Sequence, residues 1–221
     1  MPKAVIFDVD GTLIDSNDLH AAAWVEAFRH FGIKVAFADA RAQIGKGGDQ
    51  LMPVFLEPDL LQERGEEIET FRSELFKRDH LPCAQAFPGV RPLIELIKAA
   101  GQTVVLASSG KQEEVDHHVK TAGIGDLVDA VTTADDAERS KPEPDIFAAA
   151  LRRIAPLGAE EAVVVGDSPY DAQAAAKIGL RTVGLLCGGF AEGVLKGAGC
   201  IAIFRDPADL RRRYDNSPLA P

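Results

Sequence analysis

The chain has 221 residues, of which 46% are hydrophobic and 26% charged, and its formal net charge is −10. The hydrophobic content is ordinary for a globular protein with a buried core, whereas the acidity disfavours binding to nucleic acid or to an anionic membrane. The cysteines Cys83, Cys187 and Cys200 form no Cys-x-x-Cys pair, so neither a disulfide framework nor a cysteine zinc site is expected. No stretch approaches the roughly 18 apolar residues of a membrane span, and Asp8 and Asp10 interrupt any signal-peptide core. We therefore expect a cytoplasmic protein that is a monomer or a weak dimer.

Short apolar runs predict five strands, at residues 4–7, 103–107, 162–165, 182–186 and 200–204. Each run is followed by a loop and a helix-like stretch, and several of these stretches end at a glycine, as helix C-termini commonly do. Continuous apolar strands that alternate with helices are typical of a parallel sheet covered on both faces. The sequence therefore predicts an α/β fold, with a parallel sheet core sandwiched by helices.

The interval between the first two strands, about residues 15 to 88, contains no strand pattern. It indicates one helix at about 16–31, which ends at Gly32, and more charged helices near 59–79. A crossover between parallel strands needs only about a dozen residues. We therefore predict a catalytic core of residues 1–15 and 85–221, with residues 16–84 as an inserted all-helical cap subdomain. From about Arg205 the chain becomes charged, and we expect a frayed C-terminal end.

Polar residues gather where the predicted strands end, which is where open α/β sheets bind ligands. These residues are Asp8, Asp10, Gly11, Thr12, Ser108, Ser109, Gly110, Lys141, Asp167, Ser168 and Asp171. Taken singly, each has a structural explanation. The aspartates can be turn formers or helix caps, the serines N-caps, and the lysine a solvated loop residue.

Taken together, the same residues indicate chemistry. Three acids at one sheet edge repel one another unless a cation lies among them, and carboxylates with an incomplete shell suit Mg²⁺ together with waters and a substrate phosphate. Lys141 and the backbone N–H groups near Ser108–Gly110 suit a phosphoryl group. One acid can then act as a nucleophile, because the metal and the lysine neutralise negative charge around it.

Four motifs in this order resemble those of the haloacid dehalogenase superfamily, in its phosphatase and β-phosphoglucomutase-like branch with a helical cap. They are DVDGT at 8–12, the strand that ends in Ser108, Lys141 in KPEPD, and GDSPYD at 166–171. The resemblance spans about residues 1–15 and 85–205 and implies a Rossmann-like core. Within the cap, the resemblance is limited to the position of the insertion in the sequence and to its helical character.

The resemblance implies distinct roles for the acids. Asp8 is expected to be the nucleophile that forms an aspartyl-phosphate, and Asp10 the general acid for the leaving group and then the base for water. Asp8, Asp167 and the main-chain carbonyl of Asp10 are expected to bind Mg²⁺. Because acid catalysis needs Asp10 protonated first, we expect a drier, closed site to raise its pKa.

The resemblance also implies the phosphate-binding groups. Ser108 and Lys141 are expected to hold the phosphate, and the segments Gly11-Thr12 and Ser109-Gly110 to contact the substrate through backbone N–H groups. Asp171 is expected either to orient Lys141 or, together with Ser168, to support the residues that bind the metal.

Asp10 also favours a phosphatase over a true dehalogenase, because an alkoxide leaving group needs a proton and a halide does not. The form GDSPYD differs from the paired Glu and Asp of the mutases, and Asp49 stands where mutases carry a basic residue. We therefore predict a Mg²⁺-dependent phosphatase acting on a small metabolite, such as phosphoglycolate or a sugar phosphate. A sugar phosphomutase is the alternative. A phospho-accepting receiver module is a more distant one, because its acceptor follows a later strand and it has no cap.

The cap should select the substrate. His20 is either a packed or surface helix residue, or a hinge or substrate contact. Lys46, in GKGG at 45–48, is a candidate contact for a distal anion of the substrate. We expect Lys77 and the pair His117-His118 to be solvated.

Overall fold

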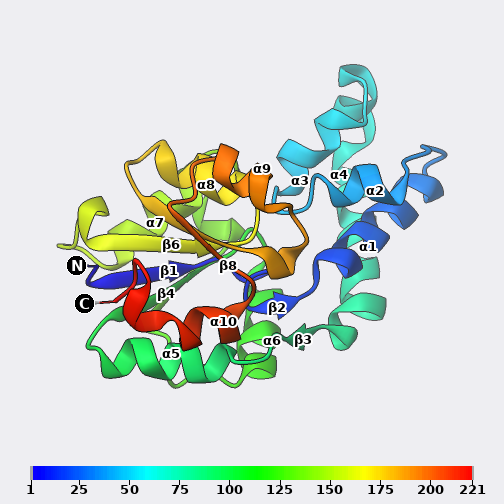
Figure 1. The fold of residues 1–221 in the computed structure, drawn as a ribbon. Helices are drawn as coiled ribbons and strands as arrows, with labels where there is room; N and C mark the ends of the chain where they lie inside the picture. The colour runs from blue at the N-terminus through cyan, green and yellow to red at the C-terminus, as the bar shows by residue number, and fades with distance from the viewer. Residues whose placement is uncertain (1, 221) are drawn as a thin grey trace.

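Six short strands rich in Val, Ile and Ala form one sheet in the computed structural model, which describes residues 2–220 (Figure 1). The spatial order is β5-β4-β1-β6-β7-β8, and every neighbouring pair is parallel. The strands are β1 (Ala4–Phe7), β4 (Thr103–Ala107), β5 (Ala130–Thr132), β6 (Ala162–Gly166), β7 (Arg181–Leu185) and β8 (Ala202–Phe204). The predicted α/β fold class is therefore confirmed.

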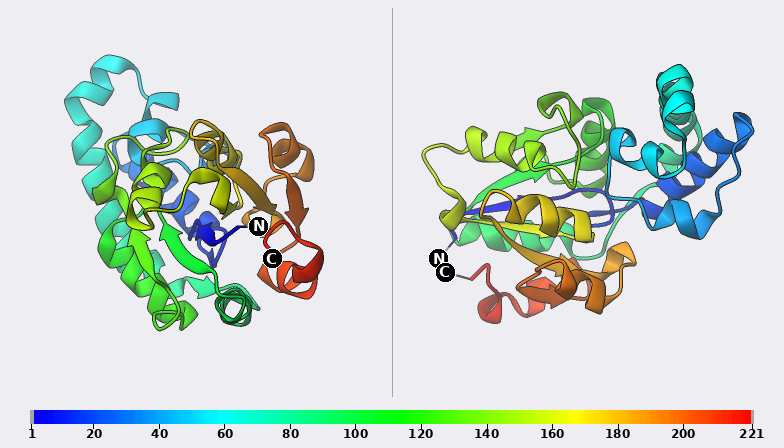
Figure 2. Two further views of the ribbon diagram at one scale, coloured as in Figure 1. Left: turned by 90° about the vertical axis from the view of Figure 1, so that its left-hand side faces the viewer. Right: turned by 90° about the horizontal axis from the view of Figure 1, so that it is seen from above.

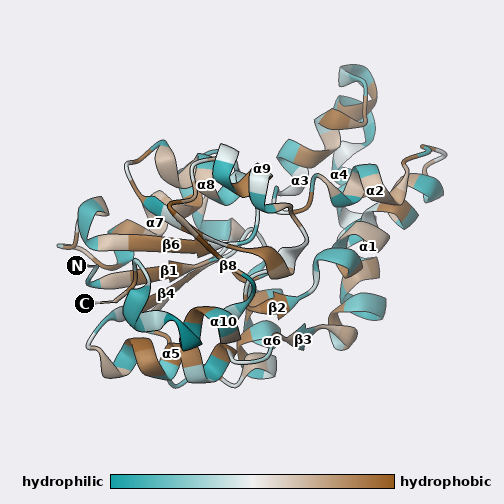
Figure 3. Cartoon of the chain, viewed as in Figure 1, coloured by the Kyte–Doolittle hydropathy of each residue, from teal (hydrophilic) through white to brown (hydrophobic). Residues whose placement is uncertain are grey.

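Both faces of the sheet are covered by helices, so the central strands have no exposed face. Successive side chains of β1 enter different clusters: Val5 and Phe7 join one, and Ala4 and Ile6 the other. Figure 3 shows the resulting apolar centre and the more polar outer helix faces. The first face is covered by α5 (Val90–Ala99), α6 (Gln112–Ala122) and α10 (Pro207–Arg212), and the second by α7 (Asp145–Arg153) and α8 (Pro169–Ala176), with α9 (Glu192–Gly197) beside β8.

The helical cap lies beyond the carboxyl end of the sheet (Figure 2). It comprises α1 (Asn17–His30), α2 (Phe37–Arg41), α3 (Gly48–Leu51) and α4 (Pro58–Leu75), which continues into a π-helical turn at Phe76–His80. Its own apolar cluster includes Trp24, Phe28 and Ile68. The two chain crossings into and out of the cap pair with each other as short antiparallel strands, β2 (Ile14–Asp15) and β3 (Gln85–Ala86).

Strand β5 was not predicted, and the frayed C-terminal end that was expected is not observed. Strand β5 is a three-residue edge strand in which only Thr132 is fully buried, so it carries little apolar signal. The C-terminal segment is docked, with Tyr214 and Leu219 in the main core cluster. Gln102 donates hydrogen bonds to the carbonyls of Pro2 and Leu219, at 2.8 and 2.9 Å, and accepts one from the Tyr214 hydroxyl at 2.6 Å. One buried amide therefore ties the N-terminal and C-terminal segments together, and Figure 2 shows that the two ends of the chain lie side by side.

None of the helices within residues 2–220 combines the length and the apolar character that a membrane crossing requires.

Candidate active site

Three buried carboxylates meet beyond the carboxyl ends of β1 and β6. Asp8, Asp167 and Asp171 each place an oxygen within 4.8 Å of the others, and their exposed fractions are 3%, 1% and 0%. The parallel register aligns the end of β1 with the end of β6, since Phe7 pairs with Val165. The sheet itself therefore brings together acids that lie about 160 residues apart in the sequence.

Lys141 neutralises two of these carboxylates. Its ammonium lies 2.6 Å from Asp8 Oδ1 and 2.8 Å from Asp171 Oδ1, and its side chain is 1% exposed. Burial alone would lower the pKa of Lys141, but Asp171 and Asp8 more than offset this and raise it. Burial raises the pKa of Asp8, with Asp171 and Asp167 adding repulsion and Lys141 opposing the rise. Asp8 therefore depends on nearby positive charge to stay ionised.

Asp167 has only neutral donors at hydrogen-bond distance. Thr12 Oγ1 lies 3.0 Å from its Oδ1 and Asn17 Nδ2 lies 2.8 Å from its Oδ2, and no Lys or Arg of residues 2–220 forms an ion pair with it. Burial and repulsion by Asp171 raise the pKa of Asp167 to about 7. A buried carboxylate that is short of positive charge, beside a second one on Asp8, fits a divalent cation with oxygen ligands.

Asp171 and Ser168 lie behind this pair. Asp171 Oδ2 accepts hydrogen bonds from the Ser168 N–H and hydroxyl, at 3.0 and 2.7 Å, while Oδ1 accepts from Lys141. Both oxygens of Asp171 are therefore engaged, and the carboxylate can fix the ammonium of Lys141 in place. The same Ser168–Asp171 pair caps the N-terminus of α8.

Gly11 and Thr12 lie beneath the carboxylates, away from the residues that line the cavity. The Thr12 hydroxyl is fully buried and lies 3.3 Å from Asp8 Oδ2 as well as 3.0 Å from Asp167 Oδ1, so its single proton can serve one of them at a time. Gly11 has a φ of +76°, and a Cβ there would lie 2.1 Å from Asn17 Nδ2 and 2.4 Å from Asp167 Oδ2. Neither residue lines the cavity, and the Gly11 and Thr12 N–H groups already donate to the carbonyls of Ile14 and Val9, at 2.7 and 3.3 Å. The structure therefore leaves no free N–H group in this segment for the substrate contacts that were predicted.

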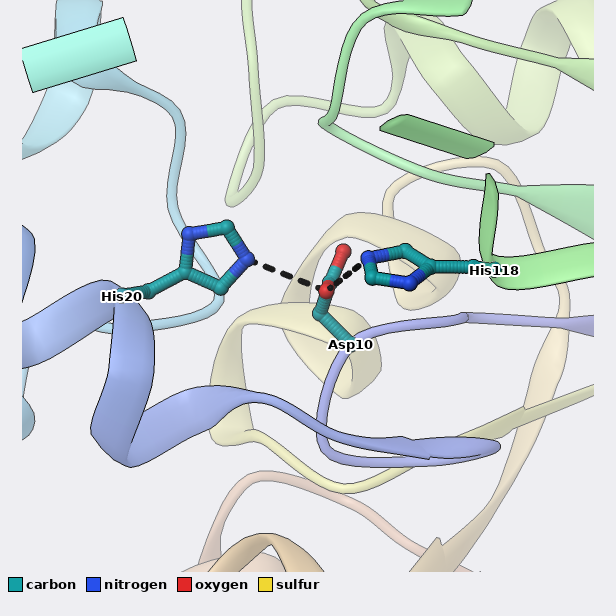
Figure 4. Close-up of side chains that lie close together, drawn as sticks. All are labelled: Asp10, His20 and His118. Carbon is teal, nitrogen blue, oxygen red and sulfur yellow. Dashed lines mark hydrogen bonds and ion pairs between the residues drawn. The ribbon is translucent and has the colours of Figure 1, made fainter. Parts of the chain in front are cut away.

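Asp10 lies between two histidines, as Figure 4 shows. His20 Nε2 from the cap helix α1 lies 3.0 Å from Asp10 Oδ1, and His118 Nε2 from the core helix α6 lies 3.2 Å from the same oxygen. The Ser16 hydroxyl donates to that oxygen at 2.6 Å. Burial alone would raise the pKa of Asp10, but His20 and His118 hold it well below its usual range.

Two expectations about this cluster were wrong. The pKa of Asp10 is lowered here and not raised, because two imidazoles lie against its carboxylate. His118 was expected to be solvated, but its exposed fraction is 1%. It lies on the inward face of α6, three residues after the buried Val115. That helical spacing was visible in the sequence, although the direction of His118 toward Asp10 was not.

Core and cap together line a cavity of about 310 Å³ above these groups. Its core side includes Asp8, Asp10, Lys141 and the segment Ser108–Lys111. Ser108 Oγ accepts a hydrogen bond from the Gly110 N–H at 3.0 Å and lies 3.5 Å from Asp10 Oδ2. The Asp8 carboxylate therefore lies in the floor of a cavity that also presents a hydroxyl and a lysine.

Comparison with known proteins assigns the family. A sequence profile described as "Haloacid dehalogenase-like hydrolase" matches residues 5–185. The chain belongs to this family. It is 27% identical over 189 residues to the Pyrophosphatase PpaX of Bacillus velezensis, covering 82% of each chain. It is 33% identical over 206 residues to the Protein SUPPRESSOR OF QUENCHING 1, chloroplastic, of Arabidopsis thaliana. That match covers 89% of this chain but only 19% of the plant protein, so it concerns one part of a much longer protein.

The structural comparison agrees with the sequence comparison. The solved structure of a hydrolase from Pseudomonas syringae superposes with a TM-score of 0.87 at 30% identity, covering 96% of this chain and 98% of that one. Further bacterial relatives are named phosphatases. The chain is therefore a haloacid dehalogenase-like hydrolase, and relatives of it are named phosphatases.

Some of the cap residues that line the cavity were not predicted. Glu69 and Arg72, from α4, line it beside Trp24. The Glu69 Oε2 and Arg72 Nε atoms are buried and have no hydrogen-bond partner among residues 2–220. No sequence signal distinguished them from other charged residues of α4, because their direction depends on how the cap packs on the core.

The two predicted cap residues also lie at the cavity. His20 contacts Asp10, and its ring stacks on Phe76 with centroids 3.9 Å apart. Lys46 lines the wall, donates to Gln43 Oε1 at 2.6 Å and lies 4.7 Å from the centre of the Tyr170 ring. Burial lowers the pKa of Lys46.

The cap loop is joined to the core next to Lys141. Ser140 Oγ accepts a hydrogen bond from the Gly47 N–H at 2.8 Å, and its hydroxyl donates to Asp49. The Ser140 N–H also donates to Asp49 Oδ2 at 3.1 Å. Asp49 therefore lines the cavity and at the same time contacts the core loop through Ser140, which ties up both of its carboxylate oxygens.

Asn17 and Gly188 complete the surroundings of Asp167 and were not predicted. Asn17 Nδ2 donates to the Gly188 carbonyl at 3.1 Å as well as to Asp167. A Cβ at position 188 would lie 1.7 Å from Asp167 Oδ2, so only glycine fits there. The neighbouring Cys187 is a partly buried thiol whose pKa is raised by burial, which makes it a poor nucleophile.

Proposed function

We propose that this haloacid dehalogenase-family hydrolase is a Mg²⁺-dependent phosphatase that cleaves a small phosphate monoester through a phosphorylated Asp8. The observation that carries the proposal is the pairing of Asp8 with Lys141 at 2.6 Å, in the floor of a cavity between core and cap. A buried carboxylate beside a fixed cation is a poised nucleophile.

Mg²⁺ would be held by the carboxylates of Asp8 and Asp167 and by the main-chain carbonyl of Asp10. When bound, it would supply positive charge to the phosphate and to the attacking carboxylate. Lys141 supplies a further positive charge next to Asp8, with its ammonium 2.6 Å from Oδ1. The Ser108 hydroxyl and the backbone N–H groups of the following loop are the neutral donors available to the phosphate oxygens.

Two displacements complete the reaction. In the first, a bond forms between an Asp8 oxygen and phosphorus, the bond from phosphorus to the leaving oxygen breaks, and that oxygen takes a proton from Asp10. In the second, water attacks phosphorus and gives its proton to Asp10, and the bond to Asp8 breaks. Asp10 starts ionised beside His20 and His118, but an arriving phosphate dianion repels that charge and favours its protonation.

The cap limits the substrate to a small metabolite. A cavity of about 310 Å³ that is bounded by His20, Trp24, Lys46, Glu69 and Arg72 admits a compact phosphorylated molecule and not a folded phosphoprotein. Phosphoglycolate, a sugar phosphate or pyrophosphate are candidates of suitable size. The acidic composition and the three unpaired cysteines suit a cytoplasmic setting.

A sugar phosphomutase is the alternative, and one observation favours the hydrolase. The mutase pattern needs a Glu immediately before the metal-binding Asp, where this chain has Gly166. A Cβ at Gly166 would lie 2.6 Å from Asp171 Cγ, so a larger residue could not enter without moving the carboxylate that holds Lys141.

A substrate panel tests the proposal. The purified full chain is incubated with an aryl phosphate, phosphoglycolate, pyrophosphate and glucose 1-phosphate, each with Mg²⁺ or with EDTA. We expect phosphate release with Mg²⁺ only, and its loss in Asp8→Asn but not in the control Asp15→Asn, an exposed acid of the same motif. Isomerised glucose phosphate without phosphate release would overturn the hydrolase in favour of the mutase.

A further inference from the structure

Asp10, His20 and His118 form a compact donor cluster that phosphate chemistry alone does not require. The three residues come from three segments: the loop after β1, the cap helix α1 and the core helix α6 (Figure 4). Their ligand atoms all lie within 4.8 Å of one another. The cluster is distinct from the carboxylates of Asp8 and Asp167, because it offers two nitrogens and one oxygen.

Two of the three distances between these ligand atoms are close to those between neighbouring ligands of a tetrahedral metal ion, and the third lies within 4.8 Å. Zinc binds imidazole nitrogen and carboxylate oxygen at about 2.0–2.2 Å, which places neighbouring ligand atoms about 3.3 Å apart. Here His20 Nε2 and His118 Nε2 lie 3.0 and 3.2 Å from Asp10 Oδ1. A small outward movement of each imidazole would therefore suffice to admit the ion.

His118 is the second, independent observation. Its side chain is 1% exposed, yet neither ring nitrogen has a hydrogen-bond partner among residues 2–220. The contact of His118 Nε2 with Asp10 is close but poorly directed for a hydrogen bond. A buried imidazole without hydrogen bonds is costly, and coordination of a metal by Nε2 would satisfy the nitrogen that faces Asp10.

The surroundings of the cluster support ligation. The Ser16 hydroxyl donates to Asp10 Oδ1 at 2.6 Å and fixes the carboxylate, while Phe76 stacks on the His20 ring and fixes its plane. Hydrogen bonds and packing contacts of this kind hold the ligands of a metal site in the correct orientation. Asp10 and His20 also line the cavity, so the fourth position of an ion would open toward water or substrate.

We propose that Asp10, His20 and His118 form a second cation site, selective for Zn²⁺ over Mg²⁺, whose occupation inhibits hydrolysis. Two imidazole nitrogens suit Zn²⁺, whereas Mg²⁺ takes oxygen ligands. The ion would occupy the carboxylate that transfers the proton, and it would tie cap helix α1 to core helix α6. The proposed binding of Zn²⁺ depends only on the geometry of these three residues. The proposed inhibition also rests on the proposed phosphatase function.

Binding is tested with Co²⁺ as a visible probe for Zn²⁺, on the full chain in excess Mg²⁺. Nitrogen-ligated four-coordinate Co²⁺ absorbs strongly in the visible range, whereas Co²⁺ with oxygen ligands only absorbs weakly. We expect one strong band per chain that Zn²⁺ displaces. The band should persist in Asp167→Asn and in His117→Phe, and binding should weaken at least about ten-fold in His118→Gln.

Two results would overturn the site: absence of the band in the wild type, or an unchanged band in His118→Gln. His118→Phe, with its fold checked by circular dichroism, serves as a second variant should the Gln variant unfold.

Inhibition is measured separately. With Mg²⁺ saturating, Zn²⁺ should inhibit the wild type, and His118→Gln should need at least about ten-fold more Zn²⁺ for the same inhibition. Equal sensitivity would place inhibitory zinc at the carboxylates and overturn the regulatory role. If the chain lacks phosphatase activity altogether, the proposed function fails while the Co²⁺ spectra still decide the cation site.

Discussion

Replacing Lys141 by Met should destabilise the fold in a pH-dependent way. Lys141 is 1% exposed and lies between the buried carboxylates of Asp8 and Asp171, at 2.6 and 2.8 Å. Removing one partner of a buried ionic network leaves uncompensated charge and typically costs about 3–5 kcal/mol. We therefore expect the free energy of unfolding in EDTA at about pH 8 to fall by about that amount.

The sign of the pH effect follows from the pKa shifts. The pKa of Lys141 is raised in the folded state, so its stabilising contribution is complete below the unfolded value and is lost only at strongly alkaline pH. In the variant, Asp8 loses the group that opposes its raised pKa. A carboxylate with a raised folded pKa destabilises the protein increasingly as pH rises. The deficit should therefore be smaller at about pH 5 than at about pH 8.

Urea unfolding at both pH values checks this reasoning. Lys177→Met is the matched control, because Lys177 pairs with Glu143 at 2.8 Å but is 43% exposed, and its loss should cost less than about 1 kcal/mol. A Lys141→Met variant as stable as that control, or equally destabilised at both pH values, would refute the account of the buried network.

Three further outcomes test other parts of the molecule. Asp10→Asn should slow hydrolysis of alkyl phosphates far more than that of aryl phosphates, and equal losses would argue against proton donation to the leaving group. Ser140→Ala removes the contacts to Gly47 and Asp49. It should raise KM by about two- to ten-fold with kcat largely kept, so an unchanged KM would mean that these contacts do not hold the cap. Tyr214→Phe leaves a buried Gln102 oxygen without its donor and should cost about 1–3 kcal/mol in urea unfolding. A negligible loss would mean that the C-terminal segment contributes little to stability.

The parts of the fold that could be predicted are those whose signal lies along the sequence. Fully buried strands such as β1 and β6 appear as apolar runs, and the parallel sheet then places the residues after them at one edge. Asp8 and Asp167 meet for that reason, and Lys141 reaches them from the loop before α7. Strand β5 was not predicted, because an edge strand of three residues can form without an apolar run in the sequence.

The errors came from features that depend on tertiary packing. The C-terminal segment is rich in charge, yet Leu210 and Tyr214, four residues apart, face the core while the charges face outward. The low pKa of Asp10 arises from two imidazoles that come from different helices. Arg72 and Glu69 reach the cavity only through the placement of the cap, which leaves no mark in the sequence.

The central claim is that Asp8 carries the phosphoryl group during turnover. The direct measurement is rapid acid quench of the enzyme with an aryl phosphate and Mg²⁺, followed by digestion and mass spectrometry. We predict the mass of one phosphoryl group on Asp8 in the wild type, and neither this adduct nor turnover in a folded Asp8→Asn variant. A phosphoryl group on another residue, or hydrolysis by Asp8→Asn at the wild-type rate, would contradict the claim.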